Sequence, residues 1–164
     1  VRNVNPTRQA PSGVNGTLAA HVQQKGETPL MSTESHEEGL TARRKVLGDD
    51  YVDRALNGLD SFDTEFQQLV TRYCWGTVWT RTTLDDRQRS LINLAMISAL
   101  NRSHEFKTHV RGALRNGCTV EEIRDTLLQV AIYCGIPAGV EAFRLAREVF
   151  DTEGVAPAPI DDTA

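Results

Sequence analysis

The chain has 164 residues, of which 40% are hydrophobic and 6% aromatic, and its formal net charge at pH 7 is −4. This length suits one domain with its own hydrophobic core, and a mildly acidic chain without a basic stripe argues against nucleic acid as a partner. No apolar run reaches the roughly 18 residues of a membrane span, and no signal-peptide core is visible. The sequence therefore predicts a cytoplasmic protein that does not enter a membrane.

The two ends of the chain differ from its middle. Residues 1–30 are rich in Asn, Gly, Pro, Gln and Thr and show no sustained hydrophobic period, which predicts disorder. We interpret the segment before Met31 as an upstream extension. The expected organisation is a disordered N-terminal extension over residues 1–37, one domain over residues 38–152 and a disordered tail over residues 153–164.

Helix signals dominate the first half of the predicted domain. Thr41 is expected to cap a short helix that ends at Gly48, and a second helix is expected to run from Asp49 to Gly58. A third should begin at Ser61 or Asp63, with apolar residues at the spacing of a core-facing row: Phe62, Phe66, Leu69, Val70 and Tyr73. Gly76 is expected to interrupt a loop over residues 75–81.

A long apolar helix should follow this loop. Residues 83–86 fit a capping box at its start, and it should end near Asn101. After its first two turns the helix is apolar nearly all round, so every side of it needs cover. A single small domain provides too little cover, which predicts an oligomer.

Three local signals mark where the last three predicted helices begin or end. A helix over residues 102–115 should stop at Asn116–Gly117. A second capping box at residues 119–122 begins the next helix, and Pro137 suits the first turn of the last one, which runs through Phe150. No segment alternates between polar and apolar residues, so the predicted fold is all-α, with about six to seven helices.

The segment that begins the helix after Asn101 carries the candidate chemistry. On a helix Arg102, Glu105 and His109 share one face, and Glu105 and His109 are an i, i+4 pair. A carboxylate beside an imidazole can set its tautomer and tune its affinity for protons, which suggests a proton-transfer site that needs no metal or cofactor. The simpler alternative is a solvated face that stabilises the helix by roughly 0.2–0.5 kcal/mol.

Other chemistries lack support in the sequence. His104 and His109 are five residues apart, so on a helix their side chains point roughly 140° apart and cannot bind one metal ion. A zinc hydrolase is therefore disfavoured, and no metal site is predicted. The chain contains no GxGxxG, GxxxxGK[ST] or GxSxG motif. Cys74, Cys118 and Cys134 form no CxxC pair and are expected to be buried thiols rather than disulfides.

A series of short blocks, in order, covers nearly the whole predicted domain: residues 42–48, 51–55, 75–79, 84–91, 104–109, 113–117, 121–124 and 133–138. These blocks resemble the 4-carboxymuconolactone (gamma-carboxymuconolactone) decarboxylases, a family of the carboxymuconolactone decarboxylase/alkyl-hydroperoxidase-like superfamily. The resemblance implies an alkyl-hydroperoxidase-like helical bundle. It also implies self-association, as a homohexamer with sites near the subunit contacts.

The redox branch of that superfamily carries a CxxC at a helix start, followed by a histidine. By this pattern the cysteine positions fall on Arg102 and Glu105 and the histidine on His109, while the superfamily's common glutamate falls on Ser90. A dithiol peroxidase activity is therefore not implied. A peroxide-reducing protein and a non-catalytic helical assembly module remain as alternative hypotheses.

The reaction implied by the resemblance is the decarboxylation of 4-carboxymuconolactone to 3-oxoadipate enol-lactone, in the catabolism of protocatechuate (the beta-ketoadipate pathway). The departing carboxylate is conjugated through a C=C bond to the lactone carbonyl, so the substrate contains its own electron sink and no cofactor is expected. As a hypothesis, His109 delivers the proton and Glu105 either orients that histidine or shares the proton; the sequence does not separate the two roles. Arg102 is a candidate to bind a substrate carboxylate. Less specific candidates for the pocket are Arg89, Arg87, Arg81, Trp75, Trp79 and Tyr133.

Overall fold

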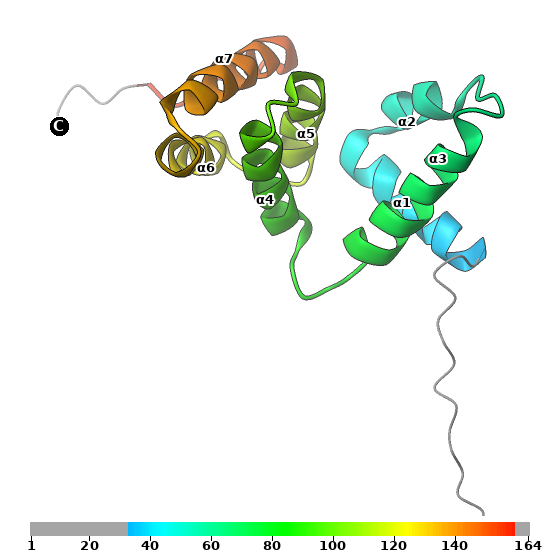
Figure 1. Cartoon of the computed structure of the whole chain (residues 1–164). Helices are drawn as coiled ribbons and strands as arrows, with labels where there is room; N and C mark the ends of the chain where they lie inside the picture. Colours follow the sequence, from blue (N-terminus) through cyan, green and yellow to red (C-terminus); the bar gives the residue numbers. More distant parts are fainter. Residues whose placement is uncertain (1–32, 160–164) are drawn as a thin grey trace, which may run out of the picture.

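The structure is a computed structural model that describes residues 33–159. These residues form helices only, which confirms the prediction of an all-α fold. Figure 1 shows two groups of helices joined by an extended segment before α4. The elements are α1 (Thr33–Leu47), α2 (Asp49–Leu56), α3 (Thr64–Leu69), the π-helix η1 (Val70–Trp79), α4 (Asp86–Ala99), α5 (Ser103–Arg115), α6 (Val120–Tyr133) and α7 (Ile136–Glu153).

The first helix is longer than predicted. It begins at Thr33, within the segment assigned to the N-terminal extension, whose residues 1–32 lie outside the described part of the chain. Thr41 does not cap it, because its hydroxyl donates to the carbonyl of Glu37 (3.0 Å) inside the helix. The first turns are polar and lack an apolar period, so no pattern in the sequence marks this start.

The expected loop over residues 75–81 is wrong, because residues up to Trp79 belong to η1. Gly76 is the point where η1 crosses α1. A Cβ atom on Gly76 would lie less than 3.0 Å from the carbonyl oxygen of Ser35, and one on Gly39 would lie 2.7 Å from the backbone nitrogen of Gly76. The glycine thus permits close packing of two helices and does not interrupt one.

Local capping fixes the starts of the later helices. Asp85, not Thr83, caps α4: its carboxylate accepts from the backbone N–H of Gln88 (2.8 Å), and the Gln88 side chain accepts from the Asp85 N–H (3.0 Å). Thr119 forms the predicted capping box of α6, and Pro137 lies in the first turn of α7, as predicted. Such boxes satisfy backbone N–H groups that a helix start leaves unpaired.

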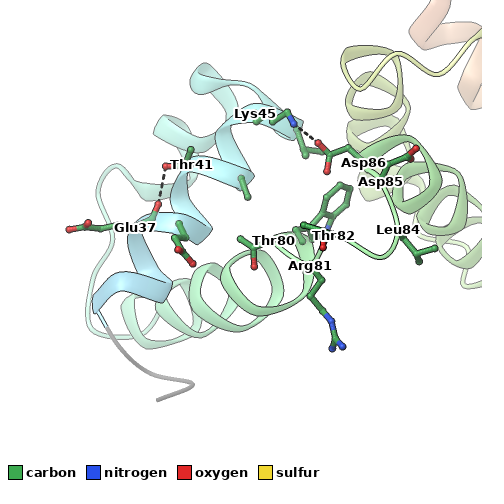
Figure 2. Close-up of a pocket in the computed structure, with 13 residues that line it drawn as sticks. Glu37, Thr41, Lys45, Thr80, Arg81, Thr82, Leu84, Asp85 and Asp86 are labelled. Atoms are coloured by element: carbon green, nitrogen blue, oxygen red, sulfur yellow. Dashed lines mark hydrogen bonds and ion pairs between the residues drawn. The ribbon is translucent and has the colours of Figure 1, made fainter. Parts of the chain in front are cut away.

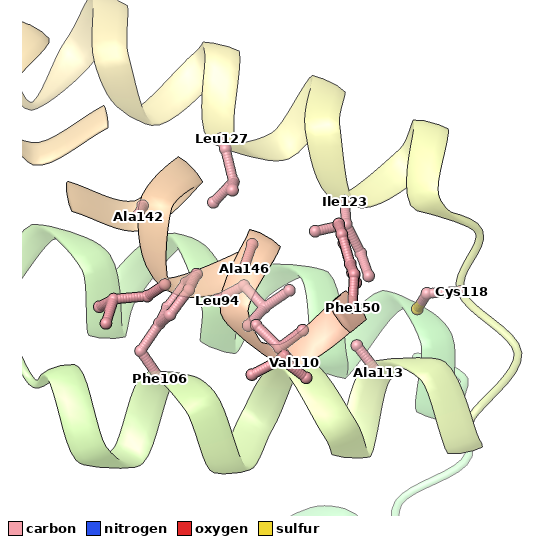
Figure 3. Packing of buried hydrophobic residues seen from close by; sticks show 12 residues of the cluster. Leu94, Phe106, Val110, Ala113, Cys118, Ile123, Leu127, Ala142, Ala146 and Phe150 are labelled. Atoms are coloured by element: carbon pink, nitrogen blue, oxygen red, sulfur yellow. The ribbon is translucent and has the colours of Figure 1, made fainter. Parts of the chain in front are cut away.

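Each group of helices has its own hydrophobic cluster. The smaller one joins α1, α2 and η1 through Val46, Leu47, Val52, Trp75 and Trp79. The larger one fills the space between α4, α5, α6 and α7 (Figure 3), and its members are Leu94, Phe106, Val110, Ala113, Cys118, Ile123, Leu127, Ala142, Leu145, Ala146, Val149 and Phe150. Burying a side chain as large as Leu or Phe stabilises a fold by roughly 1.5–3 kcal/mol, so the larger cluster dominates.

The two groups meet along α1 and α5. Arg115 donates to the carbonyl of Leu47 (2.8 Å), and Lys45 forms an ion pair with Asp86 (2.5 Å). Gly112 lets α5 approach α1 closely, because a Cβ atom there would lie 3.1 Å from Val46 Cγ1.

Many large apolar side chains lie on the surface of the single chain. The row predicted to face a core on the third helix is exposed, with Phe62 at 88%; only Val70 of that row packs against a cluster. Exposed apolar residues also follow α4 (Ile92, Met96 and Leu100) and the corner between α6 and α7 (Leu128, Ile132, Tyr133, Ile136 and Val140). The spacing identified an apolar face correctly, but among residues 33–159 that face has no partner.

The chain continues along the domain after α7. Gly154, with φ at 66°, ends that helix, and Val155 then packs against the larger cluster. Residues 160–164 lie outside the described part of the chain. Across residues 33–159 no helix is both long and apolar enough to cross a membrane.

Candidate active site

The predicted proton-transfer pair lies on α5, on the side of that helix that faces α1. Glu105 is exposed and His109 is half-buried. His109 lies one turn before Gly112, which packs against Val46 of α1, and residues three or four apart share a helix face. His109 therefore lies near the junction of the two groups of helices, and Glu105 is one turn of α5 farther from that contact.

Burial lowers the pKa of His109 below its ordinary value of 6.5, and the negative charge of Glu105 opposes that shift only in part. The neutral form of the imidazole is consequently favoured at pH 7, so His109 must take up a proton before it can deliver one. Glu105 raises the pKa of His109 through the attraction between its negative charge and the protonated imidazole.

Arg102 does not share the helix face of this pair. It is the residue before α5, with φ −98° and ψ 75°, so the helical spacing assumed from the sequence applies only to Glu105 and His109. Its side chain is exposed, and it borders a small hollow with Ser98, Phe106 and Ala142. The sequence did not reveal that the helix begins one residue later.

An open groove of about 890 Å³ lies between α1 and the segment that joins η1 to α4 (Figure 2). Its apolar part comes from Ala42, Val46, Trp79 and Leu84, and its charged residues are Glu37, Glu38, Lys45, Arg81, Asp85 and Asp86. Val46 both lines this groove and contacts α5 at Gly112, so the groove and the face that carries His109 are neighbours. Lys45, which no sequence pattern singled out, adds a positive charge to this groove, but that charge is paired with Asp86.

The two tryptophans of the chain form one stacked pair. Their ring centroids are 5.0 Å apart and their planes differ by 26°. Both are buried in the smaller cluster, but only Trp79 lines the groove. Trp79 can therefore form a wall for a bound molecule, and Trp75 supports it from behind.

The predicted arginines have different surroundings. Arg87 forms an ion pair with Glu122, so its charge is already engaged. Arg89 donates from Nη2 to the carbonyl of Arg81 (2.9 Å), and its Nε is buried without a hydrogen-bond partner among the described residues. Arg81 borders the groove, but its side chain points away from α1 in Figure 2. The structure thus brings Arg81 and Arg89 together and leaves Arg87 apart.

Tyr133 does not line the groove, and Ser90 has a structural role. Tyr133 ends α6 and is 78% exposed, so within one chain it has no wall to form. Ser90, on which the superfamily's common glutamate falls, is buried; its hydroxyl accepts from Asn116 Nδ2 (2.9 Å) and donates to the Asp86 carbonyl (2.8 Å).

The cysteines are free thiols in three environments. Cys118 is buried as expected, Cys74 is half-buried, and Cys134 is exposed, which corrects the prediction for that residue. Burial raises the pKa of Cys118 to about 11 and also raises that of Cys74, so both are protonated and weakly nucleophilic at pH 7. Within residues 33–159, His, Cys, Asp and Glu side chains form no group of three that could hold a metal ion.

The described residues thus form an all-α bundle of two groups of helices, with an imidazole and a carboxylate one turn apart on α5. The chain belongs to the carboxymuconolactone decarboxylase family, whose model matches residues 64–148. This match extends from α3 into α7 and includes the pair on α5.

Two relatives cover most of the chain. A 4-carboxymuconolactone decarboxylase of Acinetobacter baylyi is 37% identical over 126 residues, which are 77% of this chain and 94% of that protein. A nitrosuccinic acid decarboxylase of Metarhizium robertsii is 41% identical over 115 residues, which are 70% of this chain and 80% of that protein. Both names describe decarboxylases, and they fit the predicted decarboxylase rather than the peroxide-reducing alternative.

Proposed function

We propose that this chain is a carboxy-lyase that converts 4-carboxymuconolactone to 3-oxoadipate enol-lactone and CO₂, without a cofactor, in the beta-ketoadipate pathway. The observation that supports this most strongly is the 37% identity across 94% of the Acinetobacter baylyi enzyme. The identity extends over nearly that whole protein, so it includes the helices that carry the candidate site.

The chemistry of this reaction needs few protein groups. When the C–C bond to the carboxylate breaks, its electron pair moves through the C=C bond onto the lactone carbonyl oxygen and gives a dienolate. A proton must then return to the carbon next to that carbonyl. We assign this proton transfer to His109, which takes up a proton from solvent and passes it as an imidazolium to that carbon. The negative charge of Glu105 favours the protonated form, against the effect of burial.

The substrate also carries an acetate arm, whose carboxylate requires a cation. Arg89 is the best candidate among the arginines that the sequence suggested, because within residues 33–159 its Nε has no hydrogen-bond partner and its Nη2 donates to a backbone carbonyl. Arg102 and Arg81 are more exposed, and Arg87 is held by Glu122. Trp79 supplies an apolar wall, whereas Tyr133 would reach a substrate only from another copy of the chain.

The identity to the nitrosuccinic acid decarboxylase favours a second candidate substrate. Nitrosuccinate also carries two carboxylates, and the one next to the nitro group can leave because the nitro group accepts the electrons as a nitronate. Both substrates thus combine a departing carboxylate beside an electron sink with a second carboxylate that remains.

One assay series tests both candidates. The purified full chain is given carboxymuconolactone, generated in place from its muconate precursor, and separately nitrosuccinate; the release of CO₂ and the change in ultraviolet absorbance are followed. We expect turnover of the lactone to exceed that of the nitro acid. A protein that turns over neither substrate would contradict the proposed function, and a clear preference for nitrosuccinate would replace it with the second candidate.

We further propose that the chain assembles into a homohexamer, supported by the apolar corner between α6 and α7, where Ile132 is 75% exposed. Contiguous exposed apolar surface of this kind marks an interface. Changing both Ile132 and Ile136 to Asp should lower the molar mass measured by light scattering after size exclusion. Ala156→Asp, which adds a charge at an exposed position outside this corner, should not change it. An unchanged mass in the double variant would exclude this corner as an interface.

A cytoplasmic location is part of the proposal. Its support is that Cys74, Cys118 and Cys134 are all free thiols, which suits a reducing compartment.

A further inference from the structure

Arg43 stands out among the buried residues of the described part of the chain. Its exposure is only 4%, and the other buried polar residues there, Thr71, Ser90, Ser98 and Thr108, are uncharged. Its guanidinium donates from Nη1 to the Thr71 hydroxyl (3.1 Å) and from Nη2 to Gln67 Oε1 (3.0 Å). Both acceptors are neutral.

This buried charge forms no ion pair with any carboxylate in the described part of the chain, and its Nε has no hydrogen-bond partner there. Burial lowers the pKa of Arg43, while nearby Tyr51 and Cys74 oppose this only in part. Removing charges from water costs several kcal/mol per ion, and apolar replacements of buried charges are often neutral or stabilising. Stability alone therefore does not explain an arginine at this position.

The two acceptors lie on either side of the point where α3 becomes η1. Gln67 belongs to α3, and Thr71 belongs to the first turn of the π-helix. A π-helix replaces i→i+4 hydrogen bonds with i→i+5 bonds and is rarely stable without support. Arg43 connects both segments to α1, close to the crossing of Gly39 and Gly76, and so links them at the point where the winding changes.

The wider winding of η1 determines where its tryptophans lie. Residues four apart lie almost above one another in a helix with more residues per turn, and Trp75 and Trp79 stack with centroids 5.0 Å apart. Trp79 then forms part of the groove wall beside α1. A change from π to α winding would turn Trp79 relative to Trp75 and move that wall.

We propose that Arg43 is a positioning residue, which holds the α3–η1 junction in π winding and thereby places Trp79 in the wall of the groove. Its effect on catalysis rests on the proposed decarboxylase function, whereas its effect on the tryptophan pair does not. Arg43 touches no reacting atom, so a change there should alter substrate binding more than the chemical step.

The test uses Arg43→Met, which keeps an unbranched apolar chain without the charge, and Arg43→Lys, which keeps the charge without the two-armed geometry. The chain contains only two tryptophans, so near-ultraviolet circular dichroism reports their stacking directly. We expect Arg43→Met to lose most of that signal, to keep the far-ultraviolet helical signal, and to raise KM about tenfold with kcat changed less than about threefold. Arg43→Lys should keep at most part of the near-ultraviolet signal, and its KM should lie between those of the unaltered chain and Arg43→Met.

A double variant, Arg43→Met with Thr71→Val, removes the donor and the acceptor of the Arg43–Thr71 hydrogen bond and so leaves no Thr71 hydroxyl unpaired. If this variant keeps the tryptophan signal, or loses it with KM unchanged, the proposal is wrong. Arg124→Met, at an exposed arginine on α6, should change neither measurement. If the unaltered chain has no decarboxylase activity, the proposed function fails, but retention or loss of the tryptophan signal still decides whether Arg43 positions the pair.

Discussion

Changing His109 to Gln is expected to lower kcat for lactone decarboxylation by about 100-fold or more, because general acid–base groups typically contribute roughly 10²–10⁴-fold. Glutamine keeps the size and a hydrogen-bonding end but cannot take up and return a proton near neutral pH. KM should change little, since the loss falls on the transition state. Steady-state kinetics with unchanged helical circular dichroism measures this, and His104→Gln, at an exposed neighbour on the same helix, is the matched control.

The pH dependence gives this prediction a second readout. The pKa of His109 is lowered by burial and raised by Glu105, so Glu105→Gln should lower it further. A proton donor is active only while it is protonated, so the high-pH limb of kcat/KM should shift toward lower pH. The stability that a neutral buried histidine supplies is full above pH 6.5 and decreases as the pH falls toward the lowered pKa. Full turnover by His109→Gln, or a limb that moves to higher pH in Glu105→Gln, would remove the pair from the mechanism.

Changing Gly76 to Ala is expected to lower the free energy of unfolding by about 3 kcal/mol or more, the upper range for overpacking a tight interior. The added methyl would lie less than 3.0 Å from the carbonyl of Ser35, which belongs to a helix backbone and cannot yield cheaply. The α1–η1 crossing would have to open, and with it the stacking of Trp75 on Trp79. Urea unfolding followed by tryptophan fluorescence measures the loss.

Gly58→Ala provides the control for that experiment. Gly58, unlike Gly76, has a positive φ (74°), but an added Cβ atom there meets nothing within 4 Å. Gly58→Ala should therefore lower the free energy of unfolding only through backbone strain, by roughly 1–2 kcal/mol. Equal losses in the two variants would show that the crossing tolerates a methyl group, and the account of Gly76 as a close-packing residue would then be wrong.

Local chemistry explains which parts of the fold the sequence could predict. The Thr119 capping box and Pro137 were placed correctly because a cap or a first-turn proline depends on residues within one turn. Thr83 and Asp85 are both good caps, two residues apart, and only the structure distinguishes them.

Features that depend on a neighbouring helix could not be predicted. Gly76 resembles a helix breaker in the sequence, and its actual role requires knowing that Ser35 passes over it. Phe62 and Phe66 have core spacing, but periodicity identifies an apolar face without naming what covers it.

The candidate site shows the same division. The closeness of Glu105 and His109 follows from their spacing on a helix, and α5 contains both. Whether Arg102 shares the helix face of this pair depended on where α5 begins, and the structure starts α5 at Ser103. The groove joins residues of α1, such as Lys45, to residues far along the chain, so its lining could be identified only from the fold.

Because there are two separate hydrophobic clusters, the two groups of helices should differ in how readily they unfold locally. Few contacts other than those of α1 with α5 connect the helices before residue 80 to those after it. Regions with few shared contacts open at lower cost than the whole molecule, so amide hydrogens of α1 and η1 should exchange with solvent sooner than those of α5 and α7. A bound ligand in the groove would slow that exchange and so reveal itself without any turnover.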